Sequence, residues 1–162
     1  MEAVDVRDLL EQPGSSRSLH LEEELEGLRT ELASTEGPVV LDLQLESIVE
    51  GIFVTGPIWG TWTLACARCL RPIQQDFRFE VGELFAHEPD QNADEYALGD
   101  AEVDLEPMVR DAVILAMPFS PLCRPDCAGL CERCGGDRNL DECSCPPVAD
   151  PRWAALDQLD LR

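Results

Sequence analysis

Lysine is absent from the 162-residue sequence, so all 12 basic side chains are arginines. A chain without lysine cannot form a Schiff base, use a lysine as general base or build a Gly-x-x-x-x-Gly-Lys phosphate loop. Histidine is also scarce, and His20 and His87 lie in unrelated polar surroundings that are typical of surface positions. The many carboxylates fall in acidic runs, where solvation is their ordinary role. The sequence therefore predicts a protein that is not an enzyme.

Long apolar runs are missing as well. The N-terminal stretch MEAVDVRDLLEQ contains acidic residues and lacks the apolar segment of a secretory signal, and no run is long enough to span a membrane. We therefore expect a cytoplasmic protein, whose thiols are kept reduced. In that compartment a dense set of cysteines favours metal binding, while a disulfide framework in an exported protein is the alternative.

Basic residues are far fewer than acidic residues. The chain has 33 acidic residues against 12 basic ones, for a formal net charge of −21. Such a molecule repels phosphates as a whole, which argues against nonspecific nucleic-acid binding and favours a basic partner. Arginines and acids are balanced, however, in the segments 66–74 and 123–152. These arginines either neutralise a cysteine-rich site or form a face that binds a partner.

Cysteine is abundant and unevenly placed. Six of the eight cysteines lie within the 23 residues from Cys123 to Cys145, and the other two form the pair Cys66 and Cys69. Zinc takes about four thiolates in a tetrahedron, and a Cys-x-x-Cys turn supplies two of them from one tight loop. After Cys134 the chain continues with Gly135-Gly136, which permits the positive φ that such a turn requires.

The number of cysteines suits two sites of four ligands. The short gap between Cys134 and Cys143 makes it easy to close a site around the last two pairs, which leaves the four remaining cysteines for a second site. The predicted sites are Cys66, Cys69, Cys123 and Cys127, and Cys131, Cys134, Cys143 and Cys145. Two alternatives remain: a local set formed by the four cysteines between 123 and 134, and a single zinc ion with spare thiols. In each case a closed four-cysteine site is structural.

Strand patterns surround the first cysteine pair. In 39–46 the odd-numbered residues are apolar, which predicts a strand with one buried face. The stretches 48–55 and 58–65 predict a hairpin with its turn at Gly56-Pro57, which delivers Cys66 at its end. The stretch 75–81 alternates again, so strands flank Cys66 and Cys69 on both sides.

Helical patterns are fewer. An apolar stripe predicts a helix from 105 to 116, with Asp104 at its start and Pro118 beyond its end, and a shorter helix begins at Asp150. Residues 1–18 form an extended or turn-rich arm. Residues 19–32 fit either a helix or a short strand, and Gly37-Pro38 breaks the chain after them. The acidic segment 83–106 should be largely extended and solvated.

The predicted fold class is α+β: a mainly antiparallel sheet or partly open barrel with one or two packing helices and a cysteine-rich zinc-binding C-terminal segment. Residues 1–122 form the β-rich core, which includes the Cys66/Cys69 knuckle and the acidic loop 83–106. Residues 123–162 form the zinc-binding segment and the C-terminal helix, packed with the core as one domain.

Four short stretches form a specific pattern over nearly the whole chain. They are 5–10 (DVRDLL) with Pro13-Gly14, Cys66-Ala67-Arg68-Cys69-Leu70 with Pro72, the cysteine-rich stretch 118–135, and Asp150-Pro151-Arg152 with Leu156 and Leu159. Together they resemble the YceD-like large ribosomal RNA subunit accumulation proteins. Members of that family commonly carry Asn-Leu-Asn after the Cys-Gly pair, where this chain has Asn139-Leu140-Asp141 and so departs at the last position.

The resemblance implies a non-enzymatic factor for the synthesis, processing or stability of large-subunit ribosomal RNA, in which zinc stabilises the fold. The acidic charge then favours a basic ribosomal protein or a pre-ribosomal particle as partner. The candidate residues for partner or direct RNA contact are Arg68, Arg71, Arg133 and Arg138. A dithiol redox protein and a zinc-ribbon transcription adaptor are the alternative functions. Redox dithiols usually begin a helix in a βαβ unit, which neither Cys-x-x-Cys pair suggests.

Overall fold

The structure, a computed structural model, describes residues 1–89, 95–140, 143–146 and 152. Its centre is an open five-stranded sheet in the order β2-β3-β4-β5-β6. The strands are β2 (Ser16–Glu23), β3 (Ala33–Ser47), β4 (Gly51–Ala65), β5 (Pro72–Ala86) and β6 (Tyr96–Ala97). Neighbouring strands are antiparallel except β5 and β6, which are parallel. The prediction of a mainly antiparallel sheet is confirmed, but the sheet does not close into a barrel.

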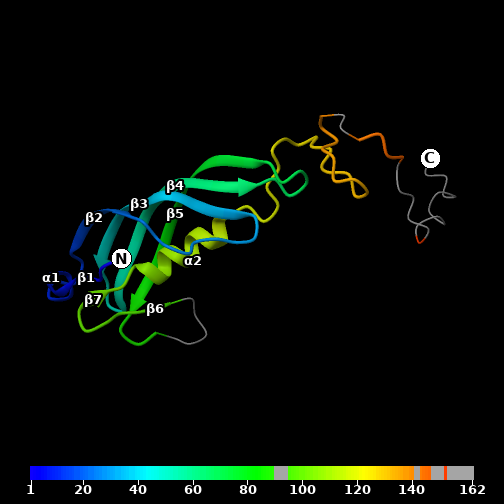
Figure 1. Cartoon of the computed structure of the whole chain (residues 1–162). Coiled ribbons are helices and arrows are strands. Elements are labelled where there is room, and N and C mark those ends of the chain that lie inside the picture. Colours follow the sequence, from blue (N-terminus) through cyan, green and yellow to red (C-terminus); the bar gives the residue numbers. More distant parts are fainter. Residues whose placement is uncertain (90–94, 141–142, 147–151, 153–162) are drawn as a thin grey trace, which may run out of the picture.

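One face of the sheet forms the core. The alternating residues Val39, Leu41, Leu43 and Leu45 of β3 are all at most 2% exposed. They belong to the same apolar cluster as the buried side chains of helix α2 (Glu106–Ala116). Figure 1 shows α2 lying along one face of the sheet. The predicted strand face and the predicted helix stripe are therefore confirmed, because each needs the other to leave water.

The ends of α2 are also where the sequence places them. The backbone N–H of Glu106 donates to Oδ1 of Asp104 at 3.1 Å, and the helix ends at Ala116, before Pro118. The only other helix in the described part of the chain is the four-residue α1 (Arg7–Leu10). The predicted helix that begins at Asp150 lies outside the described residues. Among the described residues, neither helix has the length and apolar character that crossing a membrane requires.

The predicted hairpin at Gly56-Pro57 is wrong. Strand β4 runs without a break from Gly51 to Ala65, and the chain turns instead at 48–50, where the N–H of Ile48 donates to the carbonyl of Gly51 at 2.9 Å. Gly56 has φ +139°, and a Cβ there would lie 2.2 Å from the carbonyl oxygen of Asp42 on β3. The glycine therefore permits two strands to approach closely, a role that sequence does not distinguish from a turn.

Tertiary packing decides the structure of two further segments, 19–32 and Gly37-Pro38. Residues 19–23 belong to β2, so the strand alternative for 19–32 is confirmed there and the helical alternative is wrong. Leu25 and Leu28 are nevertheless buried, because the loop that follows β2 packs over the core. Gly37-Pro38 does not end an element. It lies in a register shift of β3 between Glu36 and Val40, as a β-bulge does.

The N-terminal arm and the acidic segment both contribute short strands. Val4–Asp5 (β1) pairs with Glu102–Val103 (β7) in a separate antiparallel ribbon. Phe85 at the end of β5 and Val103 are at most 1% exposed. The expectation of a largely solvated segment from 83 to 106 is therefore wrong at both of its ends, where apolar residues pack into the core.

Replacing Gly56 by alanine should destabilise the sheet strongly. The new Cβ meets the backbone of β3, so the free energy of unfolding should fall by about 2–4 kcal/mol. Gly82→Ala is the matched control, because its Cβ would meet only side-chain atoms of Phe53 and Thr55, at 3.8 and 3.9 Å, which is ordinary van der Waals contact. Urea unfolding followed by tryptophan fluorescence measures both variants. Equal losses of stability in the two would contradict the close approach of β3 and β4 at Gly56.

Candidate metal centres

The eight cysteines form two groups of four. Within each group the Sγ atoms all lie within 4.8 Å of one another. The groups are Cys66, Cys69, Cys123 and Cys127, called the first cluster, and Cys131, Cys134, Cys143 and Cys145, called the second cluster. These are the two groups that the short gap between Cys134 and Cys143 favoured. The alternative local set of the four cysteines between 123 and 134 is not brought together.

The sulfur spacing of the first cluster fits a four-coordinate metal. Sγ of Cys66 lies 3.8 Å from Sγ of Cys127, and Sγ of Cys69 lies 3.7 Å from Sγ of Cys123. Four sulfurs at about 2.3 Å from a central zinc ion are about 3.8 Å apart along the edges of the tetrahedron. A disulfide would require about 2.05 Å, and all eight cysteines are free thiols. The first cluster could therefore hold a tetrahedral metal ion.

The hairpin of β4 and β5 positions one half of the first cluster. The two strands are paired up to Ala65 and Pro72, and the knuckle between them is closed by a 2.9 Å hydrogen bond from the N–H of Cys66 to the carbonyl of Arg71. Cys66 is fully buried and Cys69 is 7% exposed. The prediction that strands flank this pair is confirmed. In Figure 1, β4 and β5 extend past the rest of the sheet toward the cysteine-rich segment.

Backbone contacts attach the second half of the first cluster to this knuckle. The N–H of Ala67 donates to the carbonyl of Pro121 at 2.8 Å, and the N–H of Leu130 donates to the carbonyl of Arg68 at 3.1 Å. Gly129 has φ +72°, and a Cβ there would lie 3.0 Å from the carbonyl oxygen of Arg68. A glycine at this position therefore permits the two segments to lie against each other.

The second cluster begins with a similar knuckle. The N–H of Cys131 donates to the carbonyl of Gly136, and the N–H of Gly135 donates to the carbonyl of Cys131, both at 2.8 Å. Gly135 has φ +72°, as the glycines after Cys134 led us to expect. Cys134 is exposed, in contrast to the buried members of the first cluster. The second cluster therefore lies nearer to solvent than the first.

Opposing effects act on the thiols of the first cluster. Burial disfavours the thiolate of Cys66, but backbone N–H groups of Cys123, Cys69 and Arg68 donate to it and lower its pKa to about 6. Burial, together with the neighbouring thiols, raises the pKa of Cys123 to about 12. The cluster therefore accepts one negative charge readily and resists the next, and a divalent cation would remove that resistance.

The second cluster has the same electrostatic character. The backbone N–H of Cys134, together with a hydrogen bond from Cys143, lowers the pKa of Cys131 to about 5. Hydrogen bonds with Cys143 and Cys134 raise the pKa of Cys145 to about 12. One thiolate is again favoured and another is opposed, so this group also suits a cation that compensates several thiolates at once.

The four predicted contact arginines lie around the clusters. Arg68 donates through Nη1 to the carbonyl of Cys127 at 2.9 Å, and Arg71 donates through Nη2 to Asp137 at 3.2 Å. A hydrogen bond to the Cys131 thiolate raises the pKa of the Arg138 guanidinium. Arg68 and Arg138 therefore contact the cysteine clusters themselves, and Arg71 pairs with Asp137. Arg133 is exposed on the second knuckle, and contact with a partner or RNA stays a prediction for all four.

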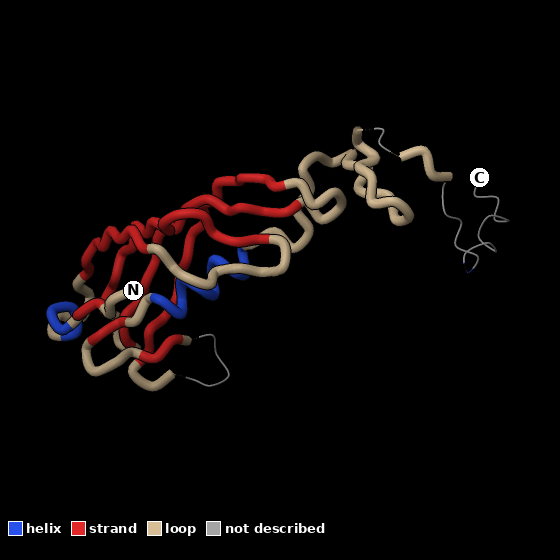
Figure 2. The backbone as a smooth tube through the Cα atoms, in the orientation of Figure 1, coloured by secondary structure: helices blue, strands red, loops and turns tan. Residues whose placement is uncertain are grey.

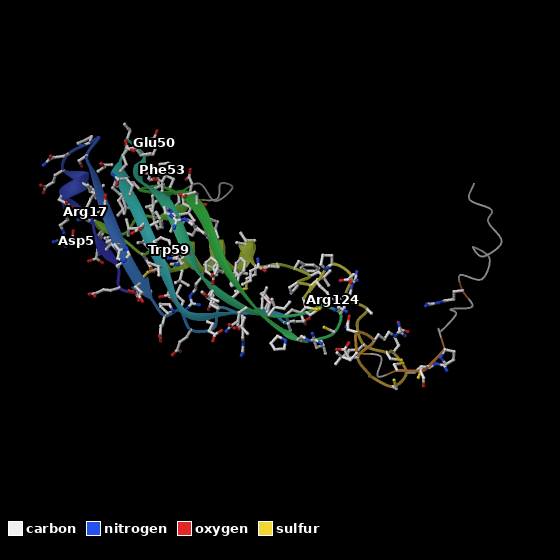
Figure 3. The ribbon with its side chains drawn as sticks, turned by 90° about the horizontal axis from the view of Figure 1, so that it is seen from above. Asp5, Arg17, Glu50, Phe53, Trp59 and Arg124 are labelled. Carbon is white, nitrogen blue, oxygen red and sulfur yellow. The ribbon has the colours of Figure 1, made fainter. Side chains whose placement is uncertain are left out.

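One residue that supports the first cluster was not predicted from the sequence. Asn139 follows the second knuckle, yet its Nδ2 lies 3.6 Å from Sγ of Cys127 in the first cluster and donates to Asp137 at 2.6 Å. Its Oδ1 accepts from the N–H of Ala128 at 2.9 Å and from Nη2 of Arg124 at 2.7 Å. Figure 3 labels Arg124 in the cysteine-rich segment beyond the sheet. The signals for this role in the sequence were an amide between two cysteine pairs and its place in the Asn-Leu-Asn pattern of the family that the chain resembles.

Both histidines lie away from the clusters. His20 is exposed on β2 and pairs with Asp42 on the neighbouring strand, while His87 is exposed just after β5. The prediction of surface positions is confirmed for both. Neither lies in the two groups of potential ligands that the described residues form.

Comparison with known proteins shows a family match that includes both cysteine clusters. Residues 54–160 match the model of a family described as large ribosomal RNA subunit accumulation protein YceD. Uncharacterized proteins of Mycobacterium bovis and Mycobacterium tuberculosis are each 38% identical to the chain, over 94% of its length and 78% of theirs. No solved structure matches the chain.

A more distant relative has a functional name. The large ribosomal RNA subunit accumulation protein YCED homolog 1, chloroplastic, of Zea mays is 23% identical over 71% of the chain and 51% of its own length. The family match begins inside β4, so it includes all eight cysteines. The region it covers therefore contains both candidate metal centres.

Asn139→Ala should weaken metal binding at the first cluster although Asn139 lies between cysteines of the second. The change removes the donor to Cys127 and the acceptor for Ala128, and supporting contacts of this kind typically contribute about 10–100-fold in affinity. A background of Cys134→Ser isolates the first cluster for Co²⁺ titration. Leu140→Ala, at a neighbouring exposed position, is the control. Unchanged affinity in Asn139→Ala would contradict the coupling.

Co²⁺ affinity should rise with pH at both clusters. The raised pKa values of Cys123 and Cys145 mean that protons occupy these thiols near neutrality and compete with the metal. Each proton that must leave contributes about tenfold per pH unit, so the gain should be at least about tenfold per unit between about pH 6 and 8. Thiolate-to-cobalt absorption measures this in the reduced chain. A flat profile would show that the thiols do not bind the ion.

Proposed function

Because the chain belongs to the YceD family of large ribosomal RNA subunit accumulation proteins, we propose that it is a non-enzymatic ribosome-biogenesis factor with two structural zinc sites. It supports the synthesis, processing or stability of large-subunit ribosomal RNA. The family match over 54–160 carries the ribosomal part of this proposal. The maize chloroplast relative, which is named as a large ribosomal RNA subunit accumulation protein, supports it.

The donor chemistry supports zinc. Each cluster offers four thiols within 4.8 Å of one another, and Zn²⁺ prefers soft thiolate ligands in a tetrahedron. Four cysteines fill that coordination shell and leave no open position for water or substrate. A zinc ion there stabilises the fold and does not catalyse a reaction.

Zinc in the first cluster would join parts of the chain that are far apart in sequence. It would attach the knuckle between β4 and β5 to Cys123 and Cys127, which follow α2. The second cluster would organise the following 131–145 stretch, in which Glu132, Arg133 and Cys134 are exposed. Zinc binding in such segments contributes directly to folding, because the ligands do not come together without it.

A basic ribosomal protein, alone or in a pre-ribosomal particle, is the proposed partner. The net charge of −21 favours association with a positively charged protein and disfavours bare RNA. Arg133, exposed on the second knuckle, is the best placed of the four arginines for a direct RNA contact, because Arg68 and Arg138 contact the clusters and Arg71 pairs with Asp137. Cytoplasm or an organelle stroma, where thiols stay reduced, suits such a protein.

Zinc content and ribosomal RNA level should depend on the same cysteines. The reduced chain should bind about two zinc ions, and Cys66→Ser and Cys134→Ser should each remove one. Cys66→Ser should also destabilise the end of β4 that leads into the knuckle, because Cys66 is fully buried, whereas Cys134→Ser should leave the sheet intact. Mass spectrometry of metals, thiol titration and thermal unfolding measure these effects.

In cells that lack the protein, large-subunit ribosomal RNA should fall relative to small-subunit RNA. The wild-type gene and Leu140→Ala should restore it, and Cys66→Ser should not. Zinc near zero with oxidised or reactive cysteines would instead support the dithiol redox alternative. An iron–sulfur absorption spectrum would exclude structural zinc. Binding to RNA polymerase without any effect on ribosomal RNA would support the transcription-adaptor alternative.

A further inference from the structure

Large apolar side chains are exposed where α2 ends. Leu115 is 84% exposed, Phe119 is 99% exposed and Ile114 is 40% exposed. With Leu32, Met117 and Pro118 they line a groove of about 630 Å³. The opposite wall is the loop between β2 and β3, which contributes Thr30 to Leu32. A large and contiguous exposed apolar surface of this kind marks an interaction site more often than a single exposed leucine does.

The two walls of the groove are held in place by contacts of their own. Arg110 of α2 donates through Nη1 to the carbonyl of Glu26 in the loop at 2.8 Å. Figure 2 shows this loop running beside the helix. Met117 is buried in the core, and the carbonyl of Pro121 accepts from the knuckle of the first cluster. Phe119 therefore lies on a short segment that is fixed at both ends, and it points into solvent.

Charge selects among possible occupants. Glu31 lines the groove, and the same loop carries the exposed Glu24 and Glu26 against one arginine, Arg29. A second copy of this chain would bring another net charge of −21 to the contact. The phosphates of RNA would be repelled in the same way. A positively charged protein segment with apolar side chains is the occupant that complements both the apolar walls and the acidic residues of the loop between β2 and β3.

We propose that this groove binds an amphipathic segment of a basic protein. The apolar side chains of the segment lie against Leu115 and Phe119, and its arginines or lysines lie toward Glu31 and the other acidic residues of the loop between β2 and β3. This inference rests on the proposed function, since it assigns the surface that receives the ribosomal-protein partner. The aliphatic stems of the cationic residues add to the apolar contact while their charged ends stay near the carboxylates. Affinity should therefore come from the apolar anchors, and the salt dependence from Glu31 and its neighbours.

The first experiment measures the binding of the zinc-loaded full chain to each purified protein of the large ribosomal subunit of the same organism. The double variant Leu115→Ala, Phe119→Ala should bind the partner at least about tenfold more weakly, because both anchors are lost. Glu31→Gln should weaken binding about two- to fivefold and reduce its dependence on salt. Zinc content and thermal unfolding should not change, since these side chains are exposed.

Val49→Ala is the matched control. Val49 is 89% exposed in the loop between β3 and β4 and does not line the groove. This variant should bind as the wild type does. Binding by the wild type that the double variant retains would overturn the groove while leaving the proposed function in place. Failure of the wild type to bind any ribosomal protein would remove the partner from the proposed function and the groove with it.

Photocrosslinking identifies the occupant directly. Phe119→p-benzoylphenylalanine in the full chain should crosslink to the bound ribosomal protein, at a segment that contains arginine or lysine, and the same probe at position 49 should not. Crosslinks to purified large-subunit ribosomal RNA, to a second copy of the chain, or to residues 147–162 of the same chain would each overturn a basic protein as the occupant.

Discussion

The first cysteine cluster is the constraint on which the arrangement of the chain depends. It brings the knuckle after β4 together with Cys123 and Cys127, although more than fifty residues separate the two pairs. The intervening chain forms the second strand of that hairpin and the helix that covers the core. A tetrahedral ion between these thiols would close this long loop, a constraint that favours the folded state over the unfolded chain.

The distribution of charged groups over the molecule follows from this arrangement of the cysteines. A thiol within a few ångströms of a thiolate resists ionisation. Of the nearby arginines, Arg68 and Arg138 contact the clusters and Arg71 pairs with Asp137. Asn139 follows the second knuckle in the chain, and its side-chain amide lies against a thiol of the first cluster. The acidic surplus is left for other surfaces, among them the loop beside α2. The molecule therefore combines a locally neutral cysteine region with an acidic body.

Family membership indicates the biological process in which the protein takes part, and the geometry indicates the kind of surface that it offers to a partner. The match to large ribosomal RNA subunit accumulation proteins supports a role in ribosome biogenesis. The geometry supports a rigid connection, from the sheet through the end of α2 to the cysteine-rich segment, with exposed Leu115 and Phe119 along it. A fold that holds apolar anchors in solvent beside acidic residues is suited to receive a basic protein chain. In the proposed function, zinc would not contact the partner but would stabilise the segment that carries Phe119.

The sequence by itself determined the local elements and favoured one grouping of the cysteines, with two other groupings left open. Alternating apolar residues predicted the buried face of β3 and the stripe after Asp104 predicted α2, because each pattern reports a short-range preference. The short gap between Cys134 and Cys143 favoured the second cluster and left the four remaining cysteines for the first. Tertiary structure decided the rest. Gly56-Pro57 lies inside a strand because β3 passes close to it, Leu25 and Leu28 are buried without a helix because a loop covers the core, and Asn139 reaches Cys127 because two knuckles pack together. These outcomes depend on contacts between residues far apart in the chain, which no local pattern contains.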